Sequence, residues 1–334
     1  MKTLKIFRNI GLGILILALV IVGVLAGMYF HRSSPEDVIV YESTNPFTKN
    51  TPQIAAHRSG AGILPENTLL AFRSCTENDD YKPDVFEFDL HMTADGVPVL
   101  LHDDELDRTA DSELVFGKTG VLAKDKTYDE LRQLNMGAKF TADDGSMPYA
   151  ELHGEDVPDE LRILSLTDAL DYLSSKGDFR YVIEVKDGGE LGKQCVDILY
   201  QTLKERDLID NVAFGSFNGE ISDYKDEKYP DLLRGAYASE VLDFYIASLL
   251  DKEDYEPTFG VLQIPFANAK ESYYMNLGTA RLINYAHKHN LAVQYWTINE
   301  AKDMEYLMSV GADCVMTDYP DIAYKVRSET KGIK

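Results

Sequence analysis

Short apolar runs alternate with amphipathic segments along the chain that follows Pro52. N-terminal start signals, a Pro-Glu before the first and a Ser/Thr cap on the second, predict helices over Asn67–Asn78 and Ser165–Ser174. Apolar residues at helical spacing predict three more helices, over Glu190–Glu205, Thr279–His289 and Glu300–Ser309. Strand and helix alternate over roughly 270 residues, which predicts an α/β fold with a parallel sheet, most simply a (β/α)₈ TIM barrel. The runs rich in β-branched and aromatic residues, which predict strands, are Gln53–His57, Val85–Met92, Val97–His102, Tyr181–Lys186, Val212–Phe217, Leu232–Tyr237, Phe259–Pro265, Ala292–Ile298 and Cys314–Asp318.

Two places interrupt this alternation. Only Thr93–Gly96 separates the second expected strand from the third, which is too short for a crossover helix. Because Asp95-Gly96 is a turn sequence, the pair forms either a hairpin or a distorted part of the barrel, and both possibilities stay open. The acidic segment 103–161 contains several glycines and is longer than an ordinary loop. We interpret it as a small inserted subdomain on the rim that carries the chemistry.

The beginning of the sequence has a different pattern. Ile10–Phe30 contains no charged side chain over 21 positions, and a helix of this length matches the ~30 Å core of a bilayer. Lys2, Lys5 and Arg8 precede this stretch and no acidic residue does. The positive-inside rule then predicts a cytoplasmic N-terminus and an extracytoplasmic body. We therefore expect residues 1–31 to form one N-terminal transmembrane helix that anchors the protein in the cell membrane.

The alternative for this segment is a cleaved signal peptide, although the apolar region of such a peptide is usually only ~7–15 residues. Residues 32–52 contain Ser-Ser-Pro, Asn-Pro and Thr-Pro and show no sustained period, which predicts a stalk. Residues 53–325 then form the barrel domain, with its insertion at about 103–161.

Composition narrows the class of protein. The 334 residues carry a net charge of −23, which argues against nucleic-acid binding through a basic surface. Without the three basic residues of the anchor, 30 basic residues remain against 56 acidic ones, a net charge of −26. An anionic membrane surface would repel such a body, so the apolar segment must hold it there. The three cysteines are too few for a disulfide framework or a thiolate metal site.

Acidic side chains gather near the ends of two expected strands. Glu87 and Asp89 alternate with phenylalanine and leucine, so that the two carboxylates share one face of their strand. Glu184 lies at the end of the fourth expected strand. Carboxylates that line a barrel interior repel one another unless a positive charge lies between them, and a hard divalent cation with oxygen ligands is the usual solution. Glu87, Asp89 and Glu184 are therefore candidate metal ligands.

Histidines and basic residues complete the candidate site. His57 and His102 end different strands and could flank a reacting group from opposite sides, because barrel active sites form at the C-terminal ends of strands. Arg58 and Lys186 supply positive charge suited to a phosphate. No HExxH helix, Gly-x-Ser-x-Gly elbow or phosphate-cradling glycine loop is present in the sequence.

Each of these features has a plainer explanation. A single histidine at a strand end is often only a hydrogen-bonded structural residue. Glu184 and Lys186 could form a simple ion pair, and Glu87 and Asp89 could face solvent on an edge strand with the phenylalanines inward. The shared placement of all these residues at strand ends favours a functional site.

Nine short motifs contain most of these residues. They are Ala56-His57-Arg58, Pro65-Glu66-Asn67-Thr68, Phe86-Glu87-Phe88-Asp89, Thr93-Ala94-Asp95-Gly96, Val99-Leu100-Leu101-His102-Asp103, Leu106-Asp107-Arg108-Thr109, Ile183-Glu184-Val185-Lys186, Trp296-Thr297-Ile298-Asn299 and Thr317-Asp318-Tyr319-Pro320. Their order and spacing, from about Ile54 to Pro320, resemble the glycerophosphodiester phosphodiesterase family.

The resemblance implies a TIM barrel with a small insertion after the His-Asp strand, where segment 103–161 falls. It implies hydrolysis of glycerophosphodiesters to glycerol 3-phosphate and an alcohol. In that reaction, a cyclic phosphate forms when the adjacent glycerol hydroxyl attacks, and water then opens it. The implied roles are His57 and His102 as the acid/base pair, Glu87, Asp89 and Glu184 as ligands of Ca²⁺ or Mg²⁺, Arg58 and Lys186 as phosphate contacts, and Trp296 as an aromatic residue on the glycerol side.

Two departures from the family pattern are visible. Ser59 follows Arg58 where the family usually has glycine, with Gly60 one place later, so the loop could run differently above the metal. Ile163-Leu164-Ser165-Leu166 replaces the usual Pro-Thr-Leu, so the sequence does not define the residue at which the insertion ends.

Two other functions stay open. A lysophospholipase D-like or sphingomyelinase D-like phosphodiesterase could use the same barrel, although the acidic insertion 103–161 argues against an acyl-chain groove. A non-catalytic anchored binding protein is the second alternative, since fold alone does not prove activity. For a glycerophosphodiester phosphodiesterase, an outer-leaflet location suggests deacylated phospholipids, lysophospholipids or glycerol-phosphate polymers as substrates.

Overall fold

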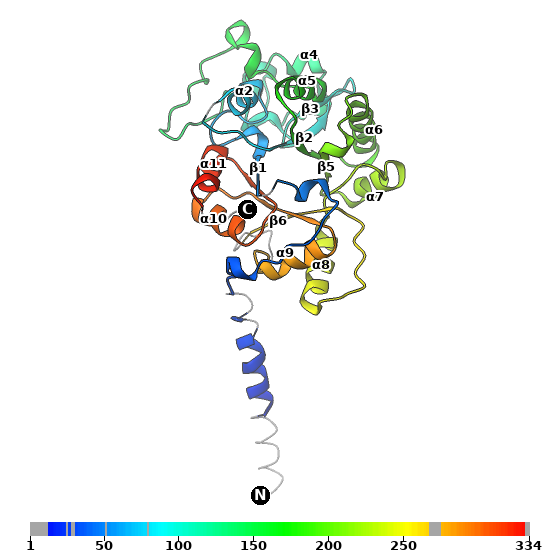
Figure 1. Ribbon diagram of the computed structural model, residues 1–334. Helices are drawn as coiled ribbons and strands as arrows, with labels where there is room; N and C mark the ends of the chain where they lie inside the picture. The colour runs from blue at the N-terminus through cyan, green and yellow to red at the C-terminus, as the bar shows by residue number, and fades with distance from the viewer. Residues whose placement is uncertain are drawn as a thin grey trace, which may run out of the picture.

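The computed structural model describes residues 13–24, 26–27, 31–50, 52–78, 80–266 and 275–330, and a barrel forms its centre (Figure 1). Seven parallel strands lie side by side in the order β5-β4-β2-β1-β8-β7-β6. Parallel bridges from Phe214 to Arg234 and from Gly235 to Val261 cross between β5 and β6. The near-closed ring confirms the predicted α/β barrel, although the expected strand Leu232–Tyr237 is reduced to these two bridging residues. The strands are β1 Gln53–Ala56, β2 Val85–Met92, β3 Pro98–Leu100, β4 Arg180–Val185, β5 Val212–Gly215, β6 Val261–Pro265, β7 Ala292–Trp296 and β8 Cys314–Thr317.

Strand β3 lies outside this ring and forms a hairpin with β2. The two strands are antiparallel, with Leu90 opposite Leu100 and Met92 opposite Pro98. Gly96 adopts a left-handed φ of 82° in the connecting turn, as the Asp-Gly sequence favours. Of the two possibilities that the sequence left open, the structure has the hairpin. The first part of β2, Val85–Leu90, pairs with β4 and belongs to the barrel.

Helices follow most strands and cover the outside of the barrel. Thr68, Ser165 and Thr279 cap the first turns of three of them by accepting a hydrogen bond from a backbone N–H. The five predicted helices correspond to α2, α5, α6, α9 and α10, and the sequence patterns missed α7, α8 and α11 as well as the short helices α3 and α4 of the insertion. The bounds are α2 Leu69–Glu77, α3 Ser112–Phe116, α4 Tyr128–Leu131, α5 Leu166–Lys176, α6 Gly189–Glu205, α7 Gly219–Lys228, α8 Ala238–Leu250, α9 Ala280–Lys288, α10 Ala301–Ser309 and α11 Pro320–Glu329.

Packing between α2 and β2 decides which face of β2 turns into the barrel. Phe72 of α2 makes edge-to-face contacts with Phe86 and Phe88, with ring centroids 5.6 and 6.2 Å apart. These rings belong to a buried hydrophobic cluster between the helices and the sheet. Because side chains alternate along a strand, burial of the two phenylalanines directs Glu87 and Asp89 to the interior.

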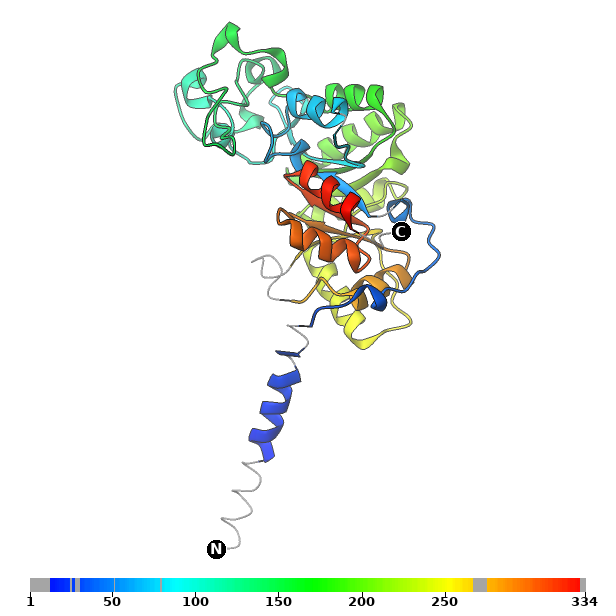
Figure 2. The ribbon, with the colours of Figure 1, turned by 60° about the vertical axis from the view of Figure 1, so that its left-hand side comes forward.

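The insertion after β3 forms a lobe beside the barrel, at the upper left of Figure 2. Short 3₁₀ and α-helical turns make up most of it, and they enclose a small core of their own. The apolar residues of this core are Val99, Leu101, Leu106, Ala110, Val121, Ala123, Leu131, Leu134, Met136 and Ile163. The lobe is therefore packed independently of the two larger cores of the barrel.

Residues 32–52, predicted to be a stalk, pack against the barrel in their described part. Asn45 donates hydrogen bonds to the carbonyls of Gly260 and Asn290. It caps the short 3₁₀ helix Pro46–Thr48, whose Phe47 is fully buried against residues at the starts of the strands. The described part of the predicted stalk thus packs onto the barrel, with Phe47 as a plug at the N-terminal end.

The segment expected to anchor the protein is described only in part. Residues 13–24 are helical and extend away from the barrel on the side of α8 and α9 in both views. Among the residues that the structure describes, no helix combines the length and the hydropathy that a membrane crossing requires. Residues 1–12, 25 and 28–30, which belong to the expected anchor, lie outside the described residues.

Candidate active site

A cavity of about 320 Å³ opens at the C-terminal ends of the strands and collects the residues singled out from the sequence. Lys186 lies beside this cavity and contacts two of its carboxylates. The structure therefore brings all eight predicted site residues to one place, although they are distributed from position 57 to position 296. Those that line the cavity itself are His57, Arg58, Glu87, Asp89, His102, Glu184 and Trp296.

A tight turn after β1 places the first two of these residues. Arg58 and Ser59 both have positive φ, 47° and 67°, and the backbone N–H of Arg58 donates to Glu87 Oε2 over 2.8 Å. Gly60 continues the left-handed path with φ of 89°. Ser59 thus adopts a backbone conformation that favours glycine. The departure from the family pattern therefore adds a strained serine to this turn.

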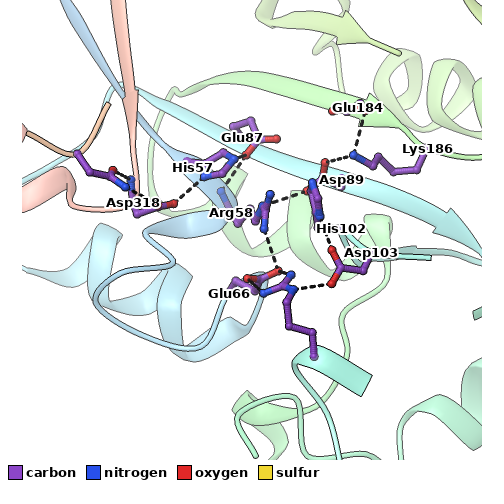
Figure 3. A network of polar contacts seen from close by, with 12 residues as sticks. His57, Arg58, Glu66, Glu87, Asp89, His102, Asp103, Glu184, Lys186 and Asp318 are labelled. Carbon is purple, nitrogen blue, oxygen red and sulfur yellow. Dashed lines mark hydrogen bonds and ion pairs between the residues drawn. The ribbon is translucent and has the colours of Figure 1, made fainter. Parts of the chain in front are cut away.

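His57 is held by carboxylates on both sides (Figure 3). Its Nδ1 lies 2.6 Å from Asp318 Oδ1, and its Nε2 lies 3.9 Å from Glu87 Oε2. Burial opposes protonation of the ring, but Glu87 and Asp318 outweigh it and raise the pKa of His57. Asn299 donates to the second oxygen of Asp318 over 2.7 Å, so this carboxylate is itself oriented.

Residues of the insertion orient His102 in a similar way. Its Nδ1 lies 2.6 Å from Asp103 Oδ1, and Arg108 Nε donates to the other oxygen of Asp103 over 2.5 Å. Arg108 also donates two hydrogen bonds, of 2.8 and 2.7 Å, to Glu66 in the loop before α2. Burial, with Arg58 nearby, lowers the pKa of His102. The imidazole is therefore fixed by a chain of charged groups that joins the insertion to the barrel (Figure 3).

The three candidate ligands lie on neighbouring strands. Asp89 and Glu184 are register partners of β2 and β4. Asp89 is 1% exposed, and neither of its carboxylate oxygens has a hydrogen-bond partner in the described part of the chain. Burial and the neighbouring Asp89 raise the pKa of Glu87 to about 8 and also raise the pKa of Glu184.

Basic side chains lie between these carboxylates. Lys186 Nζ is 3.1 Å from Glu184 Oε1 and 3.5 Å from Asp89 Oδ1, and Arg58 Nε is 3.8 Å from Asp89 Oδ2. Over the described ranges, no group of three or more His, Cys, Asp or Glu side chains has the arrangement of a metal site. The plainer explanation of Glu184 and Lys186 as an ion pair thus applies to the structure, whereas Glu87 and Asp89 are buried and do not face solvent.

Sequence reasoning assigned no role to Asp318, Asp103, Glu66 or Arg108. All four occur in the motifs that carried the resemblance, and Asp318 stands at the end of the last strand. Because β8 closes the ring by pairing with β1, a charged residue at that strand end was a signal that could have indicated a partner for His57.

Comparison with known proteins agrees with this geometry. The model of the glycerophosphoryl diester phosphodiesterase family matches residues 57–322. The chain belongs to this family. It is 29% identical over 269 residues to a glycerophosphodiester phosphodiesterase of Caldanaerobacter subterraneus subsp. tengcongensis, which covers 80% of this chain and 94% of the relative. Membership of the family confirms the prediction of an enzyme of the phosphoric diester hydrolase class.

Solved structures share the fold. The glycerophosphoryl diester phosphodiesterase domain of a Mycobacterium tuberculosis protein superposes with a TM-score of 0.65 at 20% identity, over 83% of this chain and 99% of that one. An Oleispira antarctica phosphodiesterase, solved with the product sn-glycerol-3-phosphate, superposes with a TM-score of 0.61 at 24% identity, over 83% and 97% of the two chains. Both likenesses support the barrel of this chain.

Proposed function

We propose that the protein hydrolyses glycerophosphodiesters to glycerol 3-phosphate and an alcohol. The observation that carries the proposal is the cavity in which two histidines, each hydrogen-bonded to a carboxylate, lie beside Arg58, Lys186 and three further acids. The family of the chain supports it, as does the Oleispira antarctica relative of the same fold, which binds sn-glycerol-3-phosphate.

His57 and His102 are the acid/base pair of this proposal. Because Asp318 and Asp103 each engage an Nδ1 atom, the Nε2 atom of each ring is the one that can exchange a proton with substrate. One Nε2 removes the proton of the attacking hydroxyl as its oxygen bonds to phosphorus. The other donates a proton to the alcohol oxygen as its bond to phosphorus breaks. When the attacking hydroxyl is that of the adjacent glycerol carbon, water then adds to phosphorus and opens the cyclic phosphate to glycerol 3-phosphate. Arg58 and Lys186 stabilise the negative charge that grows on the phosphoryl oxygens.

A divalent cation, Ca²⁺ or Mg²⁺, belongs to the proposal because the donors suit it. Two buried carboxylate oxygens of Asp89 lack hydrogen-bond partners within the described chain, and Glu87 and Glu184 flank them. An all-oxygen donor set of this kind is what hard cations prefer. When bound to Glu87, Asp89 and Glu184, the ion would act as a Lewis acid toward a phosphoryl oxygen.

The experiment measures release of glycerol 3-phosphate and of free alcohol from a panel of glycerophosphodiesters. We expect His57→Ala and His102→Ala each to lower kcat by about 10²–10⁴, while far-ultraviolet circular dichroism shows an unchanged fold. His153→Ala, which alters an exposed imidazole of the insertion, is the matched control. Near-wild-type turnover by either variant would contradict the assignment. A binding protein would release no product from any diester, even as the wild type.

Chelation tests the cation separately. EDTA should abolish turnover and added Ca²⁺ or Mg²⁺ should restore it, because three acids then regain their counter-charge. Full activity after exhaustive chelation would remove the cation from the proposal and leave the two histidines in it.

We further propose that the N-terminal segment anchors the enzyme in a cell membrane with its barrel extracytoplasmic. The uncharged stretch Ile10–Phe30 and the basic residues before it support this. Deleting residues 1–30 should release activity into the soluble fraction, and protease added outside intact cells should digest the barrel of the full chain. Membrane association that persists after the deletion would refute the anchor.

A further inference from the structure

The chain leaves the barrel at a fixed point beside α8 and α9. The carbonyl of His31 accepts a hydrogen bond of 2.7 Å from the side chain of Asn276. Ser33 N–H donates to the hydroxyl of Tyr306 over 3.1 Å, and the hydroxyl of Ser33 accepts from the N–H of Ala280, the first residue of α9, over 3.0 Å. These contacts hold the first part of the predicted stalk on the barrel.

The proposed anchor therefore ends directly where the barrel begins. His31 follows the uncharged stretch Ile10–Phe30 immediately in the sequence, and consecutive Cα atoms are only ~3.8 Å apart. No residue is left between them to act as a spacer. A barrel tethered in this way lies against the bilayer surface when the uncharged stretch is embedded in the bilayer.

Helix α8 is next to this exit point. Arg281, the second residue of α9, donates to the carbonyl of Leu249 at the C-terminal end of α8 over 2.9 Å. Ser33 and Leu249 thus bind neighbouring positions of α9. Both views show helix 13–24 leaving the barrel on the side of α8 and α9, with the insertion lobe at the far end (Figures 1 and 2). Helix α8 therefore belongs to the part of the barrel that is turned toward the tether.

The outer side of α8 is apolar. Leu242, Ile246 and Leu250 are 48, 46 and 65% exposed, and their spacing of four residues places them on one side of the helix. We call these three residues the α8 stripe. Phe244 and Ala247 are buried against the barrel. Of the large apolar side chains that the described barrel exposes, only those of the α8 stripe recur at helical spacing.

A bilayer suits the α8 stripe better than a second protein chain does. A stable protein interface uses about 20–30 residues on each side, whereas the stripe has three. Aliphatic side chains on one side of a helix insert at the level of the lipid headgroups. The tether keeps the local concentration of lipid high, so that a small apolar contact is enough to fix the orientation of the barrel.

Charge around the α8 stripe does not attract an anionic surface. Asp243 is exposed on α8, and Asp251 and Glu253 follow the helix. Lys288 Nζ lies 2.7 Å from Glu253 Oε1 and 3.5 Å from Asp251 Oδ1, which compensates part of this negative charge. The partner that fits this surface is thus a bilayer contacted through its apolar layer and not through electrostatic attraction.

We propose that the barrel lies directly on the membrane, with the α8 stripe inserted among the lipid headgroups. This inference rests on the proposed membrane anchor and goes beyond it, because an anchor alone leaves the orientation of the barrel open. The insertion lobe then points away from the bilayer. The first turn of α8 lines the cavity through Ala238 and Val241, so one wall of the cavity belongs to the docked helix.

Fluorescent labels on α8 test this contact in the full chain. The three native cysteines are buried, so a thiol-reactive fluorophore labels an introduced, exposed cysteine selectively. Leu242→Cys, Ile246→Cys and Leu250→Cys are labelled one at a time and reconstituted in phosphatidylcholine vesicles with or without nitroxide-labelled lipid. We expect the nitroxide to quench these labels at least twofold more than a label at Leu114→Cys, an exposed position of the insertion lobe. Equal quenching at all four positions would overturn the proposal.

A charged side chain in the α8 stripe tests insertion itself. Ile246→Asp, in the protein labelled at Leu250→Cys, should reduce the quenching at least twofold, because a carboxylate is costly to place in the apolar layer. Leu114→Asp is the matched control and should leave the quenching unchanged. Quenching that persists in Ile246→Asp would show that the tether alone brings α8 close to lipid, and insertion of the stripe would be refuted.

Two further observations separate this proposal from its alternatives. If the emission of the α8 labels changed with the number of protein molecules per vesicle and not with nitroxide lipid, the stripe would bind a second copy and the proposal would fail. A full chain that does not float with the vesicles would overturn the anchor together with the docking. A chain that floats without excess quenching on α8 would overturn the docking alone. Absence of diester hydrolysis would contradict the proposed chemistry and leave the quenching result in force.

Discussion

Asp318 shows how a residue far along the sequence can set the state of another. It lies 261 positions from His57, yet the two side chains meet because β1 pairs with β8. Burial alone would raise the pKa of Asp318, but the hydrogen bond from His57 and its charge lower it. An ionised carboxylate at Nδ1 keeps a proton on that nitrogen and fixes the plane of the ring. Asp318 is therefore a positioning residue for His57.

We expect Asp318→Asn to lower kcat by about 10- to 100-fold, since the acid/base contribution as a whole is worth about 10²–10⁴, while KM changes much less. The amide can occupy the same space but cannot supply the negative charge that favours the oriented, protonated Nδ1. Steady-state kinetics measures kcat and KM separately, and thermal unfolding shows whether the variant is folded. Glu300→Gln, an exposed neighbour on the same rim, is the control. A variant with unchanged kcat would show that Asp318 only fills space.

At this scale the sequence predicted which side chains share the site, but not how they support one another. His57, Glu87 and Glu184 follow from their placement at strand ends, which the pattern of alternating residues reveals. The link from His102 through Asp103 and Arg108 to Glu66 depends on how the insertion folds back over the loop before α2. Helix and strand periodicity carries no information about that path.

Among the elements, the long regular ones were predictable and the locally ambiguous ones were not. Helix α6 has apolar residues at consistent spacing, and its predicted and observed bounds nearly coincide. Helix α8 was missed because it is apolar on several sides, with Leu242, Ile246 and Leu250 exposed and Phe244 buried. The strand expected at Leu232–Tyr237 shrinks to two bridging residues. The neighbouring strands β5 and β6 determine how this segment pairs, so its own strand propensity does not decide its structure.

A cluster around Asp197 joins α6 to α7. Asp197 accepts hydrogen bonds from Tyr224, Tyr229 and Lys228, each 2.8 or 2.9 Å long. Burial opposes ionisation, but these donors outweigh it and lower the pKa of Asp197. A carboxyl whose pKa falls on folding stabilises the folded state above its unfolded pKa of about 3.9, and this contribution disappears as the pH falls through the folded value.

We therefore expect Asp197→Asn to lower the stability by about 1 kcal/mol at pH 7, because Asp197 is partly exposed and solvent screens the pair. Thermal unfolding at a series of pH values checks this. The difference in Tm between wild type and variant should be constant from pH 7 to pH 5 and should shrink below about pH 4. Glu227→Gln, on the exposed side of α7, should show no such pH dependence. A difference that persists at low pH would mean that charge is not its cause.

At the scale of the whole molecule, the described part of residues 32–52, which the sequence pattern predicted to be a stalk, packs onto the barrel. Ile39 N–H donates to Asn284 on α9, and Asn284 returns a hydrogen bond to the carbonyl of Asp37. Arg32 lies over the ring of Tyr306 on α10, 4.5 Å from its centre. The prolines and the lack of a period were correct indications of irregular backbone. They could not show that irregular backbone is held in place, because the partners are about 250 positions away.

Phe47 is the part of this segment that matters most for stability. Its ring is fully buried at the N-terminal end of the barrel, among Val85, Val261, Ala292 and Cys314, which all begin strands. Removing a buried phenylalanine ring typically costs about 3–5 kcal/mol, because the cavity that remains cannot collapse between rigid strands. The opposite end of the same barrel holds the cavity with the two histidines, so the ring is far from the proposed chemistry.

We expect Phe47→Ala to lower the free energy of unfolding by about 3–5 kcal/mol while kcat per folded molecule stays close to that of the wild type. Urea denaturation of the full chain measures the first quantity, and product release at low temperature measures the second. Val40→Ala, in the same segment but with a side chain that is 93% exposed, should change neither. If Phe47→Ala lowered the free energy of unfolding no more than Val40→Ala does, Phe47 would not be a structural plug. The segment would then only cover the end of the barrel, and the barrel would be stable without it.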